Sequence, residues 1–132
     1  MLASVYSFKK IIGIEYSRET LSVAEKNLAT FMSKAEPACH DIELINVDAK
    51  QYDVPDDTNI VFIYNSFAFD IMNCFLINIE KSLERRNRKI YILYYNPACN
   101  EQHIYPEKYQ YISIYDSRWF YGVNVFIAEK RY

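Results

Sequence analysis

Apolar residues in this chain fall into short continuous runs, which alternate with longer segments of helical spacing. Short runs rich in β-branched and aromatic side chains are typical of strands that are buried on both faces of a sheet. They predict strands at residues 11–15, 42–47, 60–64 and 90–95. Two later runs, 111–115 and 123–128, are joined by a short link that contains Gly122, which favours an antiparallel pair.

Two segments between these runs repeat apolar residues at the spacing of a helix face. The first extends from about Arg18 to Ser33, and Ser17 stands directly before it, where a hydroxyl can cap the helix. The second extends from about Phe69 to Arg86. Because helices or long loops separate the first four strands, these strands should be parallel. The pattern predicts a single α/β domain over residues 1–132, with a mostly parallel sheet and a C-terminal antiparallel hairpin.

Composition narrows the class of protein. A length of 132 residues with 51% hydrophobic side chains suits one domain with a packed core. The net charge of −2 gives no electrostatic case for non-specific nucleic-acid binding, so we do not expect a nucleic-acid partner. An odd, sparse set of 3 cysteines fits a reducing compartment. Met1 to Phe8 does not resemble a signal peptide, and no apolar run reaches the ~18 residues of a membrane span. We therefore expect a cytoplasmic protein with no membrane partner.

Polar side chains stand at the ends of three predicted strands. Glu15 ends the first, Asp48 follows the second, and Asn65 follows the third. In an open parallel sheet, ligands bind beyond the carboxyl ends of the strands. A carboxylate only accepts hydrogen bonds and can take two donors, so Glu15 suits two ribose hydroxyls and Asp48 suits an adenine amine. One acid after a strand is more often a helix cap, but the ordered set of three favours a nucleotide-facing site.

Three stretches resemble class I S-adenosylmethionine (SAM)-dependent methyltransferases, which have a Rossmann-like fold. Ile11 to Ser17, with Ala24 to Leu28 after it, is similar to their second strand and helix. Ile42 to Ala49 is similar to their third strand with its Asp-Ala ending. Val61 to Phe67 is similar to their fourth strand and active-site loop. The resemblance extends from about Lys9 to Pro97.

The resemblance implies SAM as the cofactor and methyl transfer to an unknown acceptor, with an amine as the candidate. Asn65 would be the catalytic residue and would accept a hydrogen bond from the target amine, while Phe67 would wall the substrate pocket. The transfer depends on alignment of nucleophile and methyl group more than on a strong base. The residues implied in cofactor binding are Glu15, Tyr16, Asp48 and Ala49.

The family's glycine-rich loop after its first strand has no counterpart here. The two glycines, Gly13 and Gly122, cannot form it. Two explanations compete: an N-terminally truncated methyltransferase that lacks its first strand, or a catalytically inactive remnant that acts as a binding or scaffold domain. We favour the first, because Leu2 to Phe8 is similar to the end of the family's first helix. The strands at 11–15 and 60–64 would then pair directly or keep bare edges, through which a homodimer could form.

Two further clusters of residues have simple structural explanations. Cys39 and His40 should lie at the opposite sheet edge from Cys99 and His103, so we expect no metal site. A basic cluster ends the second predicted helix, and we interpret it as a solvated helix end in preference to a contact for an acidic partner. Its members are Arg85, Arg86, Arg88 and Lys89.

Overall fold

A computed structural model describes residues 2–64, 67–95, 110–114 and 123–129. The chain divides into two compact units, residues 1–49 and residues 50–132, and each is described by itself. The expectation of a single domain stays a prediction.

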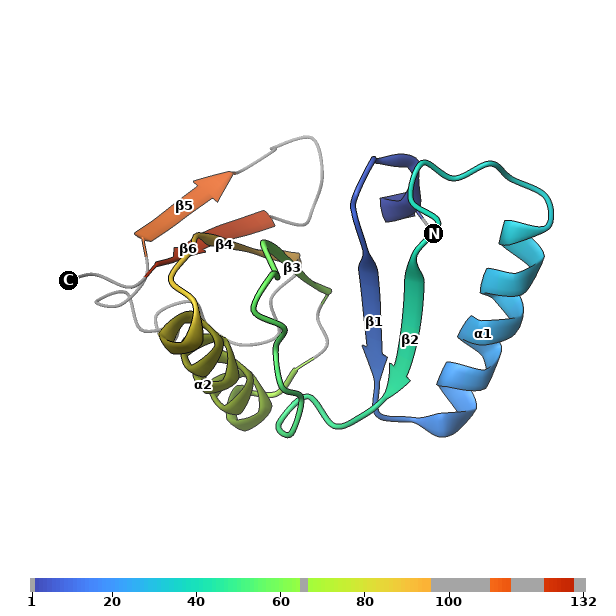
Figure 1. Ribbon diagram of the computed structural model, residues 1–132. Helices are drawn as coiled ribbons and strands as arrows, with labels where there is room; N and C mark the ends of the chain where they lie inside the picture. Colours follow the sequence, from blue (N-terminus) through green and yellow to red (C-terminus); the bar gives the residue numbers. More distant parts are fainter. Residues whose placement is uncertain (1, 65–66, 96–109, 115–122, 130–132) are drawn as a thin grey trace. The chain divides into compact units, whose positions relative to one another are not determined.

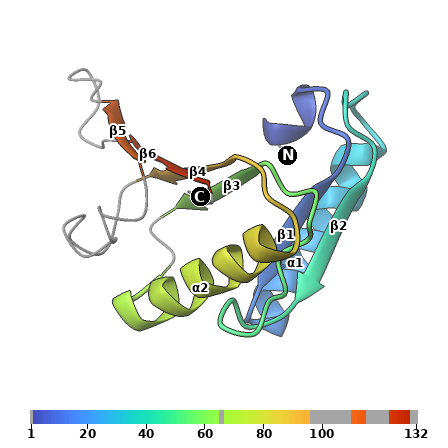
Figure 2. The same cartoon turned by 60° about the vertical axis from the view of Figure 1, so that its left-hand side comes forward.

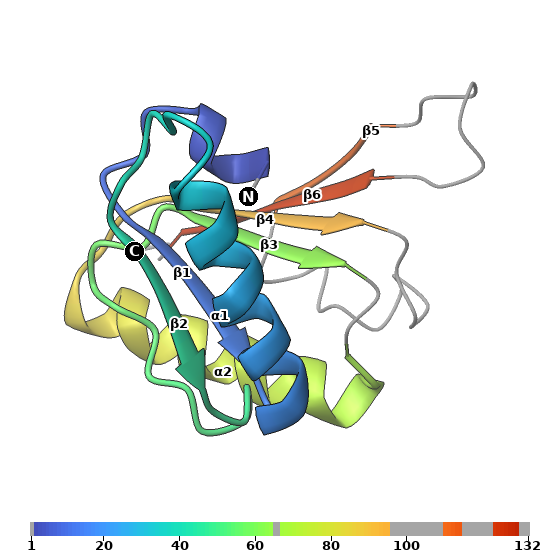
Figure 3. The same cartoon turned by 90° about the vertical axis from the view of Figure 1, so that its right-hand side faces the viewer.

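The first unit is a two-stranded parallel sheet with one long helix (Figure 1). A short 3-10 helix, η1 (Leu2–Val5), precedes strand β1 (Ile11–Glu15), helix α1 (Arg18–Met32) and strand β2 (Ile42–Asn46). Figure 3 shows α1 alongside the two strands. The strands are parallel because a helix connects them and returns the chain to the starting end of the sheet. The predicted order of strand, helix and strand is confirmed for this unit.

The register of β1 and β2 runs from Ile11 opposite Ile42 to Glu15 opposite Asn46. Gly13 lies opposite Leu44, and a Cβ atom at Gly13 would meet Leu44 Cδ2 at 2.8 Å. The glycine therefore gives the Leu44 side chain room against the neighbouring strand. The register places the last residues of both strands at one edge of the sheet.

The second unit is a four-stranded mixed sheet with one helix. It contains β3 (Ile60–Tyr64), α2 (Phe69–Arg85), β4 (Ile90–Tyr95), β5 (Gln110–Ile114) and β6 (Val123–Ala128). The strand order is β3-β4-β6-β5, in which β3 and β4 are parallel and the two later pairings are antiparallel. The predicted α/β class, with parallel strands and a C-terminal antiparallel hairpin, is confirmed.

The core of the second unit lies between α2 and one face of this sheet, as Figure 2 shows. The apolar stripe of α2 is buried, and so are the inward-facing side chains of β3, β4 and β6. The buried apolar residues of the helix are Met72, Phe75, Leu76, Ile79 and Leu83, and those of the strands are Ile63, Ile90, Ile92, Tyr94, Phe126 and Ala128.

The opposite face of the sheet is also apolar. Ile60 lies beside Tyr91 and Phe62 beside Leu93, and the Tyr64 and Tyr95 rings stack with centroids 5.2 Å apart. Ile60, Phe62, Tyr64 and Tyr91 are exposed, and Phe62 retains 65% of its accessible surface. Sequences that are apolar on both faces are typical of sheets covered on both sides, which explains why these strands read as continuous apolar runs.

Among the described strands, β1 pairs with β2 in one sheet, and β3 pairs with β4 in another. The two alternatives expected for the strands at 11–15 and 60–64, direct pairing or bare edges, stay predictions because these strands belong to separate units. Each of them is the outer strand of its own sheet.

Candidate cofactor-binding edge

The carboxyl ends of β1 and β2 form one edge of the first unit, and the chain leaves both strands there (Figure 3). Glu15 is the last residue of β1, while Asp48 and Ala49 follow the end of β2. Because β1 and β2 are parallel and in register, the residues after them extend beyond the same side of the sheet. All four of the predicted cofactor residues, Glu15, Tyr16, Asp48 and Ala49, are thus brought to one edge.

Glu15 is oriented by the start of α1. The Ser17 backbone N–H donates to Glu15 Oε1 at 2.8 Å, and the Ser17 hydroxyl in turn accepts from the Thr20 N–H at 3.3 Å. The carboxylate therefore lies at the positive end of the helix, where a negative charge is favourable. Among the described residues, no donor reaches the second oxygen, Glu15 Oε2. Glu15 acts both as part of the helix start and as an available acceptor.

Asn46 is a residue of this edge that the sequence did not single out. Its side-chain Nδ2 donates to the Glu15 carbonyl at 2.9 Å and to the Tyr16 carbonyl at 2.8 Å. The Val47 N–H also donates to the Glu15 carbonyl, at 3.1 Å. The signal in the sequence is faint: one amide at the end of a mostly apolar strand, two residues before Asp48. Its role depends on the register of the two strands, which one sequence does not give.

The other three cofactor candidates differ in exposure. Tyr16 is 77% exposed, so its ring is free to cover a flat ligand. Asp48 is half-buried and Ala49 is buried, which places a small side chain directly after the acid. This edge thus offers carboxylates, an open ring and a small residue, a set that fits the ribose and adenine of a nucleoside.

The two residues predicted to face the methyl acceptor belong to the second unit. Asn65 lies outside the described residues. Phe67 is half-buried, and its ring lies 5.6 Å from that of Phe75 on α2, at 55°. Phe67 is therefore anchored to the core of its own unit, and its role as a substrate wall stays a prediction.

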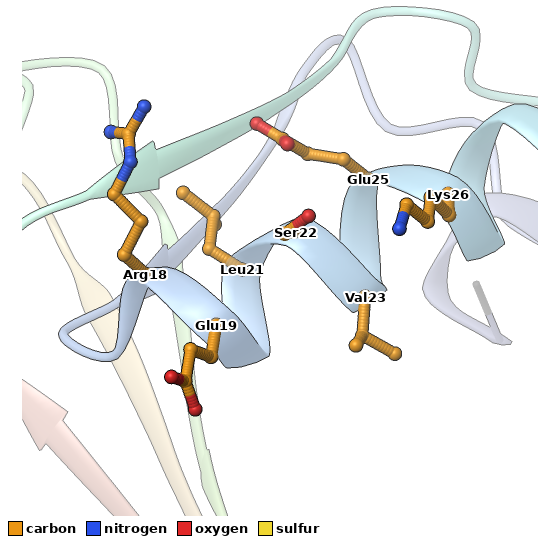
Figure 4. Close-up of a pocket in the computed structure, with 7 residues that line it drawn as sticks. All are labelled: Arg18, Glu19, Leu21, Ser22, Val23, Glu25 and Lys26. Atoms are coloured by element: carbon orange, nitrogen blue, oxygen red, sulfur yellow. The ribbon is translucent and has the colours of Figure 1, made fainter.

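A shallow hollow on the first unit lies along α1, as Figure 4 shows. All of its lining residues come from one stretch of that helix, between Arg18 and Lys26, and their side chains point in several directions. None of the predicted site residues lines it. This hollow is a feature of a helix surface, and we assign no ligand to it.

The basic cluster at the end of α2 is exposed at Arg85, Arg86 and Lys89 and half-buried at Arg88. Two of its members, Arg85 and Arg88, also contact the loop before β3. Arg85 Nη1 pairs with Asp53 at 2.9 Å, and Arg85 Nε pairs with Asp56 at 2.7 Å. Arg88 donates to the carbonyls of Thr58 at 2.7 Å and Pro55 at 2.9 Å. The guanidinium groups have five donors in a rigid fork, and here they fasten the loop before β3 to the helix.

The electrostatics of this cluster follow from the same contacts. The hydrogen bond from Arg85 lowers the pKa of Asp56 below its ordinary value of 3.8. The paired carboxylates of Asp56 and Asp53 raise the pKa of Arg85. Partial burial lowers the pKa of Arg88, because desolvation disfavours its charge.

The described residues form neither a metal-ligand cluster nor a membrane-spanning helix. Within the described part of the chain, no three His, Cys, Asp or Glu side chains are grouped as metal ligands would be. Cys39 is buried and its Sγ lies 3.5 Å from the Asp41 carbonyl oxygen, while Cys99 and His103 lie outside the described residues. No described helix combines the length and apolar character that crossing a membrane requires.

The α/β arrangement, with its parallel strands and terminal antiparallel strands, is shared with solved structures of three bacterial proteins. The sequence matches no protein-family model and no curated protein. The chain is, however, similar in structure to solved proteins.

Three similar structures come from bacteria. A Haemophilus influenzae protein assigned as a methylase has a TM-score of 0.55 at 17% identity, over 92% of this chain and 74% of its own. An Escherichia coli protein assigned as a methyltransferase has a TM-score of 0.64 at 17% identity, over 93% and 66%. A Streptococcus thermophilus rRNA methylase has a TM-score of 0.57 at 16% identity, over 93% and 75%. At identities this low, the TM-scores show a shared fold.

Proposed function

We propose that the edge formed by β1 and β2 binds the adenosine part of SAM, and that the protein serves methyl transfer. The observation that carries the proposal is the position of Glu15. In a fold shared with methyltransferases, its carboxylate stands at the carboxyl end of β1 with Oε2 open to a ligand. Ligands of open parallel sheets bind at such edges.

The residues at this edge fit the cofactor by their chemistry. Glu15 would accept from the ribose hydroxyls and Asp48 from the adenine amine, since both carboxylates are acceptors. The Tyr16 ring would cover the adenine, and Ala49 would leave space for it. When bound, SAM would supply an electrophilic methyl group. Asn65 would accept a hydrogen bond from the acceptor amine, which aligns its nitrogen with the methyl, and Phe67 would exclude water.

The acceptor is an amine in this proposal, and its molecular class is open. One similar structure is named as an rRNA methylase. The expectation that nucleic acid is not a partner therefore finds no support among the similar structures. A net charge of −2 argues against non-specific binding, but it does not exclude a specific contact with RNA.

The alternative function, an inactive binding or scaffold domain, rests on the glycines. Gly13 lies inside β1, opposite Leu44, and so cannot belong to a loop that cradles the methionine end of SAM. Gly122 lies outside the described residues. Under this alternative the edge keeps its shape without binding SAM.

Calorimetry with SAM separates the two functions. We expect the chain to bind SAM, and Glu15→Gln to weaken binding by about tenfold or more, the effect of losing a charge-assisted hydrogen bond. The substitution keeps an oxygen for the Ser17 N–H, so the start of α1 remains. Glu25→Gln, on the exposed surface of α1, is the matched control. Absence of SAM binding at millimolar concentration would count against the proposed site and favour the scaffold function.

Homodimerisation through the unpaired strand edges is part of the proposal. Its support is that β1 and β3 each end a sheet. Sedimentation over a range of concentrations tests it, and a constant monomer mass counts against it.

A further inference from the structure

The carbonyl groups of Glu15 and Tyr16 lie where β1 ends and the chain turns toward α1. The Glu15 carbonyl accepts from the Val47 N–H at 3.1 Å, as the next ladder bond of β1 and β2 would require. It also accepts from Asn46 Nδ2, and the same nitrogen reaches the Tyr16 carbonyl at 2.8 Å. One side-chain amide thus holds the carbonyls of two successive residues.

We infer that Asn46 is a positioning residue for the acidic side chain of the cofactor site, an inference that rests on the proposed SAM function. By fixing the backbone on both sides of the Glu15–Tyr16 peptide link, Asn46 restrains the direction in which the Glu15 side chain leaves the strand. The Ser17 N–H then holds Glu15 Oε1 at 2.8 Å. The Glu15 residue is thus restrained at its backbone by Asn46 and at Oε1 by Ser17, and Oε2 is presented to the ribose hydroxyls.

The chemistry of this position requires an amide. Asparagine supplies two N–H donors from one neutral group, so it can serve two carbonyl oxygens without adding charge beside a carboxylate. Aspartate has the same size but only accepts hydrogen bonds, and at this position it would face two carbonyl oxygens. Alanine would leave the Tyr16 carbonyl without its side-chain donor. Preorganised groups bind more tightly because less ordering is needed on binding.

The first test compares S-adenosylhomocysteine with its 2′,3′-dideoxyribose analogue by calorimetry. In the unaltered chain we expect the hydroxyls to improve binding by about tenfold or more. In Asn46→Ala and Asn46→Asp, this ratio should fall toward one, because the carboxylate is no longer aimed at the ribose. Asn27→Asp, an exposed change on α1, should keep the ratio. A purely structural role would weaken both ligands equally and leave the ratio unchanged, which overturns the inference.

The second test needs no ligand. Hydrogen exchange of the Ser17 amide reports whether Glu15 Oε1 is still held, and we expect Asn46→Ala to accelerate it by about tenfold while amides in α2 are unaffected. Unchanged Ser17 exchange also overturns the inference. Asn46→Ser keeps one donor, so its Ser17 exchange rate should lie between those of the unaltered chain and Asn46→Ala. This milder variant keeps the test informative if Asn46→Ala does not fold.

The two proposals fail in different ways. If the unaltered chain binds no S-adenosylhomocysteine, the proposed function fails and the inference falls with it. If the chain binds that ligand and Asn46→Ala keeps the full hydroxyl ratio, the function stands and only the role of Asn46 is rejected.

Discussion

The two units of the chain differ in how much of their surface each buries. In α2, seven residues are buried, and the sheet of the same unit has four strands. In α1, all of which the structure describes, Leu21 alone is buried, and the sheet beside it has two strands. Two-stranded sheets have little independent stability, and burial of apolar surface is the main favourable term in folding.

The candidate site and the larger part of the buried core thus belong to different units. The first unit holds Glu15, Asn46 and Asp48 at a polar strand edge, whereas the second supplies most of the buried apolar core. Binding sites are drawn from the less stable parts of proteins. The first unit, which buries fewer apolar side chains, therefore relies on local hydrogen bonds, such as those of the Ser17 cap and the Asn46 amide, to fix its side chains.

The largest expected effect comes from the core of the second unit. Ile79 on α2 has 0% exposure, so Ile79→Ala should lower the free energy of unfolding by about 2–5 kcal/mol, through lost transfer energy and a cavity. Ile77→Ala on the same helix is the control, because Ile77 is 48% exposed and should cost much less. Urea unfolding measures both. Equal losses of unfolding free energy at Ile77 and Ile79 would show that the buried core of the second unit is not its main source of stability. The contrast drawn between the two units would then fail.

A smaller effect is expected at Arg88. Arg88→Ala removes the donors to the carbonyls of Thr58 and Pro55 and to the buried hydroxyl of Ser82. Unsatisfied buried acceptors cost about 1–3 kcal/mol. Arg86→Ala, an exposed neighbour on the same loop, provides the control. A midpoint in urea that is unchanged for Arg88→Ala would show that the loop before β3 is held by other contacts.

The smallest effect is a pH dependence at Asp56. Its folded pKa lies below 3.8 because Arg85 stabilises the ionised form, so its contribution is present above that pH. The contribution is lost as the pH falls through the lowered pKa. We expect stability to fall less steeply with acid below about pH 4 in Asp56→Asn than in the unaltered chain. Asp57→Asn, an exposed neighbour, should keep the original slope. Identical slopes in all three proteins would contradict the role given to the Arg85 contact.

The elements could be predicted from the sequence almost to the residue. The helix expected from Arg18 to Ser33 ends at Met32, and the strand expected at 111–115 is Gln110–Ile114. These boundaries follow from local signals: the Ser17 cap and the change from helical to continuous apolar patterning. The edge that carries Glu15 and Asp48 was also predictable, because parallel strands share a carboxyl edge.

What could not be predicted depends on contacts far apart in the sequence. Asn46 meets the Glu15 carbonyl 31 residues away, a contact set by register. The sequence does not indicate the intramolecular contacts of Arg85 and Arg88, because cations at a helix end are usually solvated. Their partners are carbonyls and acids in the loop of residues 53–58, about 30 residues earlier, which lies beside α2 only once the unit has folded.

The exposed apolar side chains of β3 and β4 have a consequence for solubility. Ile60, Phe62, Tyr64 and Tyr91 are exposed, while a net charge of −2 gives the molecules little mutual repulsion. Salts that are excluded from protein surfaces strengthen apolar attraction and also screen that weak repulsion. The solubility of the chain should therefore drop as sulfate is added. A Phe62→Lys chain, with a charge among these side chains, should stay dissolved up to a higher sulfate concentration.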